Sequence, residues 1–324
     1  MNTLTAKAVD TRISDLILAP PKRVAVAKFG VEHEMFPRSW RPTRLIDGFY
    51  DHDDDDDDDD GADAAADYVG QAARLGLCSP RLHDYHCGCD DCDCERDSDS
   101  PLMATQEDCT VGVEHVSRIL NVNSTVDLDQ LGQWIAFLQQ WKDDGGWMPN
   151  GQATCGNHIH VEAPDIEVEH SRPNLVSTVV NAPYAAFDWE HVADGGCGRI
   201  RPYNHKPDPE PRRYGDDTYN LGSWFCRKYT NGGRTWEHRL WNSPSDPQRM
   251  WVHVGLSVAI TRWAADAAEA IWLHDSETSL RLSDASSIVL GRRDEWVAAV
   301  IERLPSDPRF VIAGEVLASN LSVY

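Results

Sequence analysis

The sequence has no long apolar run, no secretory leader pattern and no P-loop motif. Its longest apolar stretches fall well short of the roughly 18 residues that a membrane-spanning helix needs. Residues 1–15 lack a basic patch followed by an apolar stretch, so we expect no signal peptide and a cytoplasmic protein without a membrane segment. The pattern GxxxxGK[ST] does not occur, which argues against a P-loop nucleotide site.

Basic residues are also few. The chain has 30 Lys and Arg against 53 Asp and Glu, and a formal net charge of −23. Part of the excess is local, because residues 51–67 contain 11 Asp and neither Lys nor Arg. Without that segment the net charge is −12. Because nucleic acid and anionic membranes are polyanions, we expect no non-specific binding to either, although a local cationic pocket for phosphates is compatible with these totals.

The composition is that of a folded protein. With 41% hydrophobic residues, 26% charged residues and 12 Trp, full disorder and fibrous structure are excluded. Strands and helices are mixed without strict βαβ alternation, so we predict an α+β class. We expect one domain over 1–324, with a core at about 23–273 and a helical extension at 274–324. Residues 51–60 are interpreted as a disordered acidic insertion, and 78–100 as a Cys-rich insertion.

Periodicity and capping residues predict the main elements. Strands are expected at 23–36, 111–122, 153–163 and 234–242. One helix is expected within 62–76, closed by Gly76, and another from a cap at Asp127 or Asp129 to Trp141. Further helices are expected at about 173–189, from a cap at 245–247 to about 272, and lastly at 294–304. Residues 78–100 and 191–234 are expected to be loops.

Four of the nine cysteines lie within eight residues. Without a secretory leader we expect reduced thiols and not a disulfide framework. The spacings C-x-C and C-x-x-C suit a separate structural Zn²⁺ site, but four abutting ligands would strain one tetrahedral ion. Cys78, His83 or His86 would then replace one or two of them, and loose reduced thiols are the alternative. The four cysteines are Cys87, Cys89, Cys92 and Cys94.

Three predicted strands each carry two polar side chains at positions i and i+2, which point to the same face of a strand. The pairs are Glu32 with Glu34, His158 with His160, and Glu237 with Arg239. Carboxylates with imidazoles suit Mg²⁺ or Mn²⁺, and the planar fork of arginine matches phosphate oxygens. Together they suggest phosphoryl transfer from a nucleotide.

Each pair, taken alone, can also be explained without a functional role. Two glutamates alone are more typical of a solvated strand face. Two histidines alone would equally well be structural residues or zinc ligands. Three such pairs on one face are improbable as surface decoration, so the joint pattern favours a metal and nucleotide site.

The order of these segments resembles a known family. GVEHE, then D-x-T and GVEHVS, then CGNHIHV, then TWEHRLWNSPSDP before a long helix are similar to the amidoligases, carboxylate–amine ligases with the glutamine synthetase-like fold. The resemblance covers about residues 29–272. It implies a concave antiparallel sheet with helices on its outer face, and ATP with Mg²⁺ or Mn²⁺ bound on the concave side.

The resemblance also implies roles for individual residues. Glu32 and Glu34 match the metal-binding and catalytic pair, and Glu114 matches the acidic ligand of the second strand, with Asp108 a weaker match upstream. Further matches are His158 and His160 near metal and nucleotide, Glu237 as a metal ligand, Arg239 as a catalytic phosphate contact, and Arg199 and Arg201 as additional phosphate ligands.

The sequence departs from the family pattern in three places. His238 stands where a hydrophobic residue is common, and we expect it to point away from the site. The Asp run is an unusual insertion. Arg118 stands where the family often has Pro, which could alter the end of that strand. None of these changes removes a proposed ligand.

The implied activity is ATP-dependent formation of an amide or isopeptide C–N bond through an acyl phosphate. The carboxylate and amine substrates could be small molecules, peptides or proteins, and a homo-oligomer is compatible with the family. Three alternatives stay open: an amine or guanidino kinase of the same fold, a zinc-dependent hydrolase using His158, His160 and a carboxylate, and a non-catalytic phage or accessory protein that has kept the fold.

Overall fold

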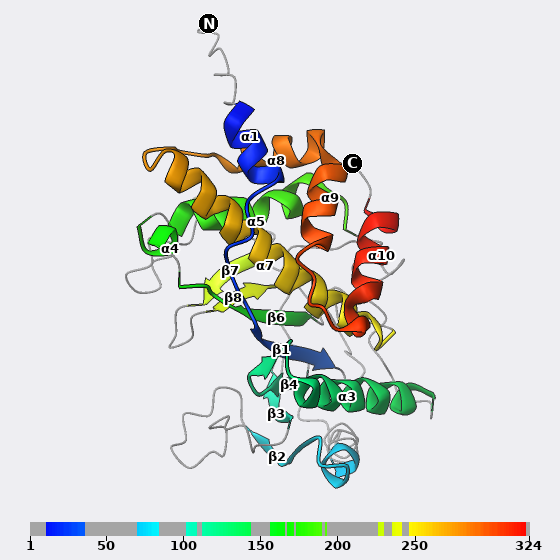
Figure 1. The fold of residues 1–324 in the computed structure, drawn as a ribbon. Coiled ribbons are helices and arrows are strands. Elements are labelled where there is room, and N and C mark those ends of the chain that lie inside the picture. Colours follow the sequence, from blue (N-terminus) through cyan, green and yellow to red (C-terminus); the bar gives the residue numbers. More distant parts are fainter. Residues whose placement is uncertain are drawn as a thin grey trace, which may run out of the picture.

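The computed structural model combines helices with one largely antiparallel sheet (Figure 1). The predicted α+β class is therefore confirmed. None of the helices in the part of the chain that the structure describes is long and apolar enough to cross a membrane. The described residues are 11–35, 70–83, 102–108, 112–143, 156–165, 167–171, 173–189, 192, 226–229, 235–241 and 246–321.

The sheet brings together the four strands whose sequences carry the polar pairs and Glu114. Its order is β2–β3–β4–β1–β6–β8–β7, and the short β5 pairs with β1. β2 and β3 are parallel, and the other pairs are antiparallel. The strands are β1 Lys28–Met35, β2 Cys78–His83, β3 Met103–Asp108, β4 Gly112–Ser117, β5 Leu120–Asn121, β6 Asn157–Glu162, β7 Cys226–Tyr229 and β8 Thr235–His238.

The strand register places the polar residues on one face. Directly opposed residues of neighbouring strands lie on the same side of a sheet. Glu34 of β1 is opposite Glu114 of β4. Glu32 of β1 is opposite His158 of β6, and His160 of β6 is opposite Glu237 of β8. Carboxylates and imidazoles from four adjacent strands therefore share this face, which we call the polar face.

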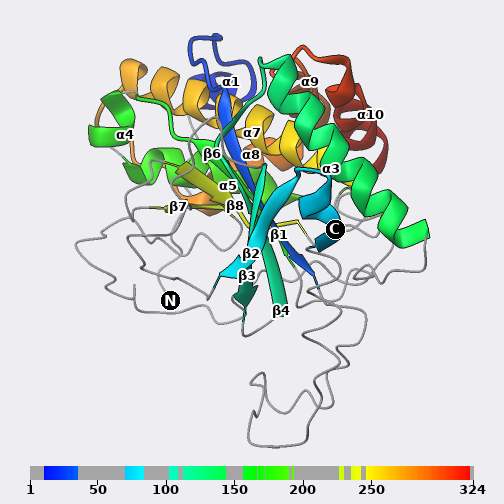
Figure 2. The ribbon, with the colours of Figure 1, turned by 90° about the horizontal axis from the view of Figure 1, so that it is seen from below.

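Helices bury the opposite face (Figures 1 and 2). Trp134 of α3 contacts the ring of His115 in β4, and Tyr184 of α5 hydrogen-bonds to His238 of β8. α7 packs on β6 and β1, and also on α1, α5, α9 and α10. The helices are α1 Thr11–Leu18, α3 Thr125–Asp143, α4 Glu167–Ser171, α5 Pro173–Ala186, α7 Arg249–His274, α8 Leu282–Gly291, α9 Arg293–Ile301 and α10 Val311–Asn320, with a 3₁₀ turn at Pro308–Phe310.

The central helix α7 is buried on all sides along most of its length. Its sequence explains this, because apolar and alanine residues occur at nearly every position and leave no polar stripe for solvent. One polar residue within it, Asp266, is 1% exposed. Asp266 accepts hydrogen bonds from the backbone N–H groups of Arg23 and Val24 and from the guanidinium of Arg303.

These bonds explain why the first strand is shorter than predicted. We expect a strand over 23–36, but β1 begins only at Lys28. The backbone N–H groups of Arg23 and Val24 bind the Asp266 carboxylate, and the carbonyl of Val26 accepts from Arg262. Because side chains of α7 take these backbone groups, Arg23, Val24 and Val26 do not use them in a strand ladder.

Further elements differ from the expectation, and one of them is β7, a strand at Cys226–Tyr229 within residues 191–234, where we expect loop. α3 begins at Thr125. The N–H of Asp127 in its first turn donates to the Ser124 hydroxyl. The cap of this helix is therefore Ser124, and not Asp127 or Asp129 as predicted. α7 begins at Arg249, because Asp246 closes a turn to the N–H of Gln248 before the helix starts. Residues 78–83 form the edge strand β2, although we expect loop there. Burial of Cys78 against the core explains the change.

The C-terminal part contains more helices than predicted. α9 matches the helix expected at 294–304, but α8 precedes it and α10 follows it. α1 is also unpredicted, because its eight residues give too short a periodic pattern to be distinguished. By contrast, Gly76 has the expected left-handed conformation, with φ of 71°, after helical residues 70–74.

Asp266→Ala should destabilise the protein strongly. Removing one partner of a buried ion pair leaves the other charge uncompensated, which typically costs about 3–5 kcal/mol. The surface pair of Arg281 and Asp284 provides the control, since Asp284→Ala should have a far smaller effect on the free energy of unfolding. Urea unfolding of both variants checks this. Equal, small losses would show that Asp266 does not tie residues 23–24 to α7.

Candidate functional site

Glu32 is the centre of the polar face. Its Oε2 lies 3.2 Å from Nδ1 of His158, and its Oε1 lies 2.9 Å from Nε2 of His160. Both imidazoles come from β6, where the two-residue alternation turns them to the same side. The side chain of Glu32 is 24% exposed whereas that of His158 is 3% exposed. The carboxylate is therefore the more accessible half of this pair.

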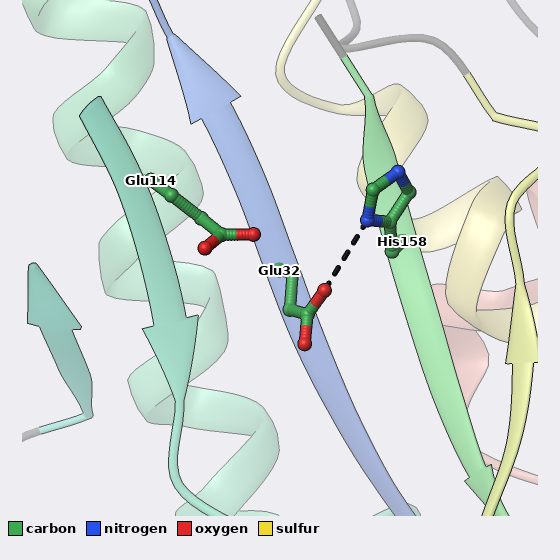
Figure 3. A group of neighbouring side chains, drawn as sticks. All are labelled: Glu32, Glu114 and His158. Carbon is green, nitrogen blue, oxygen red and sulfur yellow. Dashed lines mark hydrogen bonds and ion pairs between the residues drawn. The ribbon is translucent and has the colours of Figure 1, made fainter. Parts of the chain in front are cut away.

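Two groups of three candidate metal ligands share Glu32. The first ligand group is Glu32, Glu114 and His158, and the second ligand group is Glu32, His160 and Glu237. Within each group, one ligand atom per residue lies within 4.8 Å of the others. Figure 3 shows the first group on three neighbouring strands, with helices behind the sheet. The polar pairs predicted from sequence thus converge in space.

Glu34 has a different place from Glu32, although both were expected to bind metal. Its Oε2 accepts a hydrogen bond from the N–H of Gly156, and its Oε1 lies 3.7 Å from Nε2 of His158. The Glu34 N–H in turn donates to the carbonyl of Gly156, at 3.0 Å. Glu34 belongs to neither ligand group. The position of Glu34 is better suited to orienting the His158 ring than to coordinating a metal ion directly.

Gly156 has to be small for this arrangement. A Cβ atom there would lie 2.4 Å from Nε2 of His158 and 3.3 Å from Oε2 of Glu34. The contact with His158 is shorter than real Cβ atoms make, so the His158 side chain would have to move. The motif CGNHIHV contains the necessary glycine directly before Asn157.

Arg239 contacts the second ligand group. Its guanidinium pairs with Oε1 of Glu237, which is 1% exposed. Arg239 follows the last residue of β8 and is only partly buried. The predicted strand extends to Asn242, but the ladder ends at His238. Arg239 therefore lies beyond the last paired residue of the strand.

The site contains charges that offset one another. Burial alone would raise the pKa of Glu32, but the neighbouring His160 and His158 outweigh it, and the pKa lies well below 4.5. Burial alone would lower the pKa of His160, but Glu32 and then Glu237 raise it above 6.5, against the opposing charge of Arg239. Glu32 is thus an anion and His160 is held toward its cationic form.

The face under the helices carries polar residues that the sequence did not identify as important. His33, His115 and His238 are all 0% exposed, and each directly follows a glutamate of the polar face. His238 points away from the site, as predicted, and bonds to Tyr184 and Thr261. The two-residue alternation of the strands could have indicated that these histidines lie under the helices, because the residues on either side of each histidine lie on the opposite face.

Burial keeps these histidines neutral. It lowers the pKa of His33 to about 4, although a hydrogen bond with Asn157 acts in the other direction. Burial, with the nearby His160, lowers the pKa of His238 to about 3. Burial, with the nearby His33, also places the pKa of His115 well below 6.5. Charging any of them in the folded protein is costly.

Several predicted residues lie outside the described part of the chain. They are Arg199 and Arg201, the Asp run at 53–60, and the four clustered cysteines Cys87, Cys89, Cys92 and Cys94. Of the alternative zinc ligands, Cys78 is buried in β2. Burial raises the pKa of its thiol to about 11, despite a hydrogen bond with Thr105.

No family model, curated protein or solved structure matches the chain. The roles considered below therefore rest on the geometry of the polar face and on the chemistry of its residues.

The buried histidines should make the metal-free protein acid-sensitive below pH 6.5. Their folded-state pKa values are depressed, so the unfolded chain takes up protons that the native state refuses as pH falls from 6.5 toward 4. The free energy of unfolding should fall by about 1.4 kcal/mol per pH unit for each such proton. His160, whose pKa is raised, contributes fully below 6.5 and does not offset this loss.

Urea titrations between pH 7 and pH 4.5, with a chelator present, measure this slope. His33→Gln should reduce the slope by about one proton. A free energy of unfolding that stays constant over this range would contradict a neutral buried state.

Proposed function

We propose that the protein is an ATP-dependent carboxylate–amine ligase whose polar face corresponds to that of the glutamine synthetase-like amidoligases. One observation carries the proposal: Glu32 is shared by two ligand groups, and an arginine contacts the second group. Two adjacent divalent-ion positions and a cation beside them match the needs of a triphosphate next to a carboxylate substrate.

The donor set fits Mg²⁺ or Mn²⁺. Each ligand group consists of two carboxylates and one imidazole, and hard divalent ions prefer oxygen ligands and keep several waters. Glu32, Glu114 and His158 would hold one ion, and Glu32, His160 and Glu237 would hold another. When bound, the ions would offset the charge repulsion between ATP and the substrate carboxylate.

The protein's own side chains would then position and stabilise charge. The guanidinium of Arg239 would turn from Glu237 to a phosphate oxygen. Negative charge develops on that oxygen as the phosphoryl group moves. The substrate carboxylate would take the γ-phosphoryl group of ATP and release ADP. The amine would attack the acyl carbon of that acyl phosphate, expelling phosphate and losing a proton to form the amide. Glu34 would keep His158 oriented throughout.

The zinc hydrolase is less well supported. It requires His158 and His160 on one ion with a carboxylate and an open water position. Among the described residues, neither ligand group contains both histidines, because they contact different oxygens of Glu32. An amine or guanidino kinase would use the same polar face and stop after phosphoryl transfer. An amide product, detected by mass spectrometry after incubation with ATP, carboxylates and amines, separates the ligase from the kinase.

Thermal stability tests the metal and nucleotide site. Mg²⁺ with ATP at about 100 times the dissociation constant should stabilise the folded protein by about 2.7 kcal/mol. The stabilisation should need both components and should disappear in Glu32→Gln, which weakens both ligand groups at once. Differential scanning calorimetry measures the shift in melting temperature.

Glu162→Gln is the matched control. Glu162 lies on β6 two residues after His160, is half-exposed and pairs with Lys28 at 3.8 Å. It belongs to neither ligand group, so its loss should leave the stabilisation intact. Stabilisation by Zn²⁺ but not by Mg²⁺ with ATP, lost in His158→Ala, would reject the ligase and favour the hydrolase.

Gly156→Ala should impair metal binding without touching a ligand. The added Cβ would clash with Nε2 of His158 and force its ring out of the position it holds beside Glu32. Loss of ligand orientation of this kind typically lowers metal affinity about 10–100-fold. Mn²⁺ titration followed by electron paramagnetic resonance measures the affinity. Gly132→Ala is the control, since a Cβ there would meet the Trp251 side chain at an ordinary 3.7 Å. An unchanged Mn²⁺ affinity in Gly156→Ala would exclude His158 as a ligand.

A further inference from the structure

Every strand of the two ligand groups carries a buried imidazole or amide next to a ligand, on the face under the helices. On β1 it follows Glu32, on β4 it follows Glu114, on β6 it precedes His158, and on β8 it follows Glu237. All four of these residues are fully buried, with an exposed fraction of 0%: His33, His115, Asn157 and His238. Apolar residues would fill these places at lower cost, because burying a polar group is unfavourable unless its hydrogen bonds are made.

His238 makes the most complete set of these hydrogen bonds. Its Nδ1 lies 2.6 Å from the hydroxyl of Tyr184 on α5, and its Nε2 lies 2.8 Å from Oγ1 of Thr261 on α7. The Tyr184 and His238 rings also meet edge to face, with centroids 5.9 Å apart. Both nitrogens of one ring are thus engaged, each by a different helix.

The residues on either side of His238 belong to the second ligand group or contact it. Glu237 is a ligand of that group, and Arg239 pairs with Glu237. β8 has only four residues and ends at His238. Its ladder with β6 fixes the strand through main-chain bonds, but the last ladder pair is Ile159 with His238. Beyond that pair, the next main-chain bond runs from the N–H of Asn157 to the carbonyl of Trp241, at 3.0 Å, so Arg239 lies between two main-chain restraints.

Directional bonds restrain a strand end in a way that apolar packing does not. Apolar burial has no preferred direction, so it favours no particular rotation of a side chain that keeps the same area buried. A hydrogen bond prefers angles above about 150° and weakens steeply below about 120°. Two bonds from different helices to one ring therefore fix the rotation of β8 about its axis, and with it the direction in which Glu237 projects.

We propose that His238 is a positioning residue for the metal site: its bonds to Tyr184 and Thr261 hold β8 so that the Glu237 carboxylate stays in the second ligand group. The inference rests on the proposed function, because it concerns the same ligands. It differs from a purely structural role of His238 in one measurable respect. Loss of the two bonds should lower metal affinity even where the stability of the fold is retained.

The test removes the bonds without leaving unpaired polar groups. In the triple variant Tyr184→Phe, His238→Phe and Thr261→Val, both partners of each bond become apolar groups of similar shape. Such replacement is close to neutral for stability, whereas removing one partner alone is not. The urea midpoint should therefore stay near that of the wild type. The Mn²⁺ dissociation constant should rise about 10–100-fold, the effect typical of losing support behind a metal ligand.

Ser257→Ala is the matched control. The indole N–H of Trp241 donates to the Ser257 hydroxyl at 2.8 Å, so this is another buried bond between the residues after β8 and α7. Neither residue adjoins a ligand in the sequence. Ser257→Ala should lower the urea midpoint and leave the Mn²⁺ dissociation constant unchanged. An unchanged constant in the triple variant, or an increase in both variants that follows stability alone, would overturn the inference.

A metal-free measurement separates this inference from the proposed function. The ring signals of His158 and His160, recorded by NMR with a chelator, report the surroundings of the polar face without any ion. They should shift in the triple variant and remain in place in Ser257→Ala. If the wild type binds no Mn²⁺, the proposed function fails, and these signals alone decide the inference: no shift in the triple variant rejects it.

If the triple variant does not fold, Tyr184→Phe alone takes its place. It removes the bond to Nδ1 and keeps the ring of residue 184 and the bond from Thr261. The same two measurements apply, compared at equal temperature with Ser257→Ala. Shifted ring signals and weaker Mn²⁺ binding support the positioning role, and wild-type values for both reject it.

Discussion

The polar face depends on how its negative charges are kept together. Glu32, Glu34, Glu114 and Glu237 project from β1, β4 and β8, with β6 between β1 and β8, and all except Glu32 are at least nine-tenths buried. Two carboxylates within 4.8 Å of each other repel by about 3 kcal/mol at an effective dielectric constant of 20. His158, His160 and Arg239 offset this repulsion, and divalent ions would do so more completely.

The opposite face of the sheet provides the rigidity that such an arrangement needs. α7 is enclosed on all sides by other elements. Its buried carboxylate, Asp266, connects the residues before β1 to Arg303, which follows α9. The buried His238 connects β8 to α5 and α7 through two hydrogen bonds. Apolar packing thus supplies most of the stability, while a few directional bonds determine how the ligand strands face one another.

The two ligand groups also explain why one carboxylate matters more than the others. Glu32 reaches both histidines with separate oxygens, so it links the first and second ligand groups. Glu34 lies behind His158 and takes a supporting position. In the segment E-H-E, Glu32 is therefore the candidate ligand shared by both groups, His33 lies buried under the helices, and Glu34 supports His158. The two glutamates have the same side chain but different surroundings, so the fold gives them different roles.

Local pattern alone was sufficient for the strands of the site and for the face on which their side chains lie. Two-residue alternation in VEHEM, NHIHV and TWEHR predicts which residues share a side, because strand geometry leaves no other choice. The α+β class followed from the mixture of periodic patterns. The long helix α7 was expected nearly to its end, since its apolar content admits only a buried helix.

Tertiary structure decided what the pattern left open. The adjacency of β4, β1, β6 and β8, and therefore the sharing of Glu32, results from long-range pairing that no local signal encodes. The start of β1 depends on Asp266, which bonds to Val24 across 242 residues of sequence. β2 is a strand because β3 and the core cover it, although its residues alternate poorly. Periodicity predicts the face of a residue, but only packing determines its neighbours, and neighbours determine the chemistry.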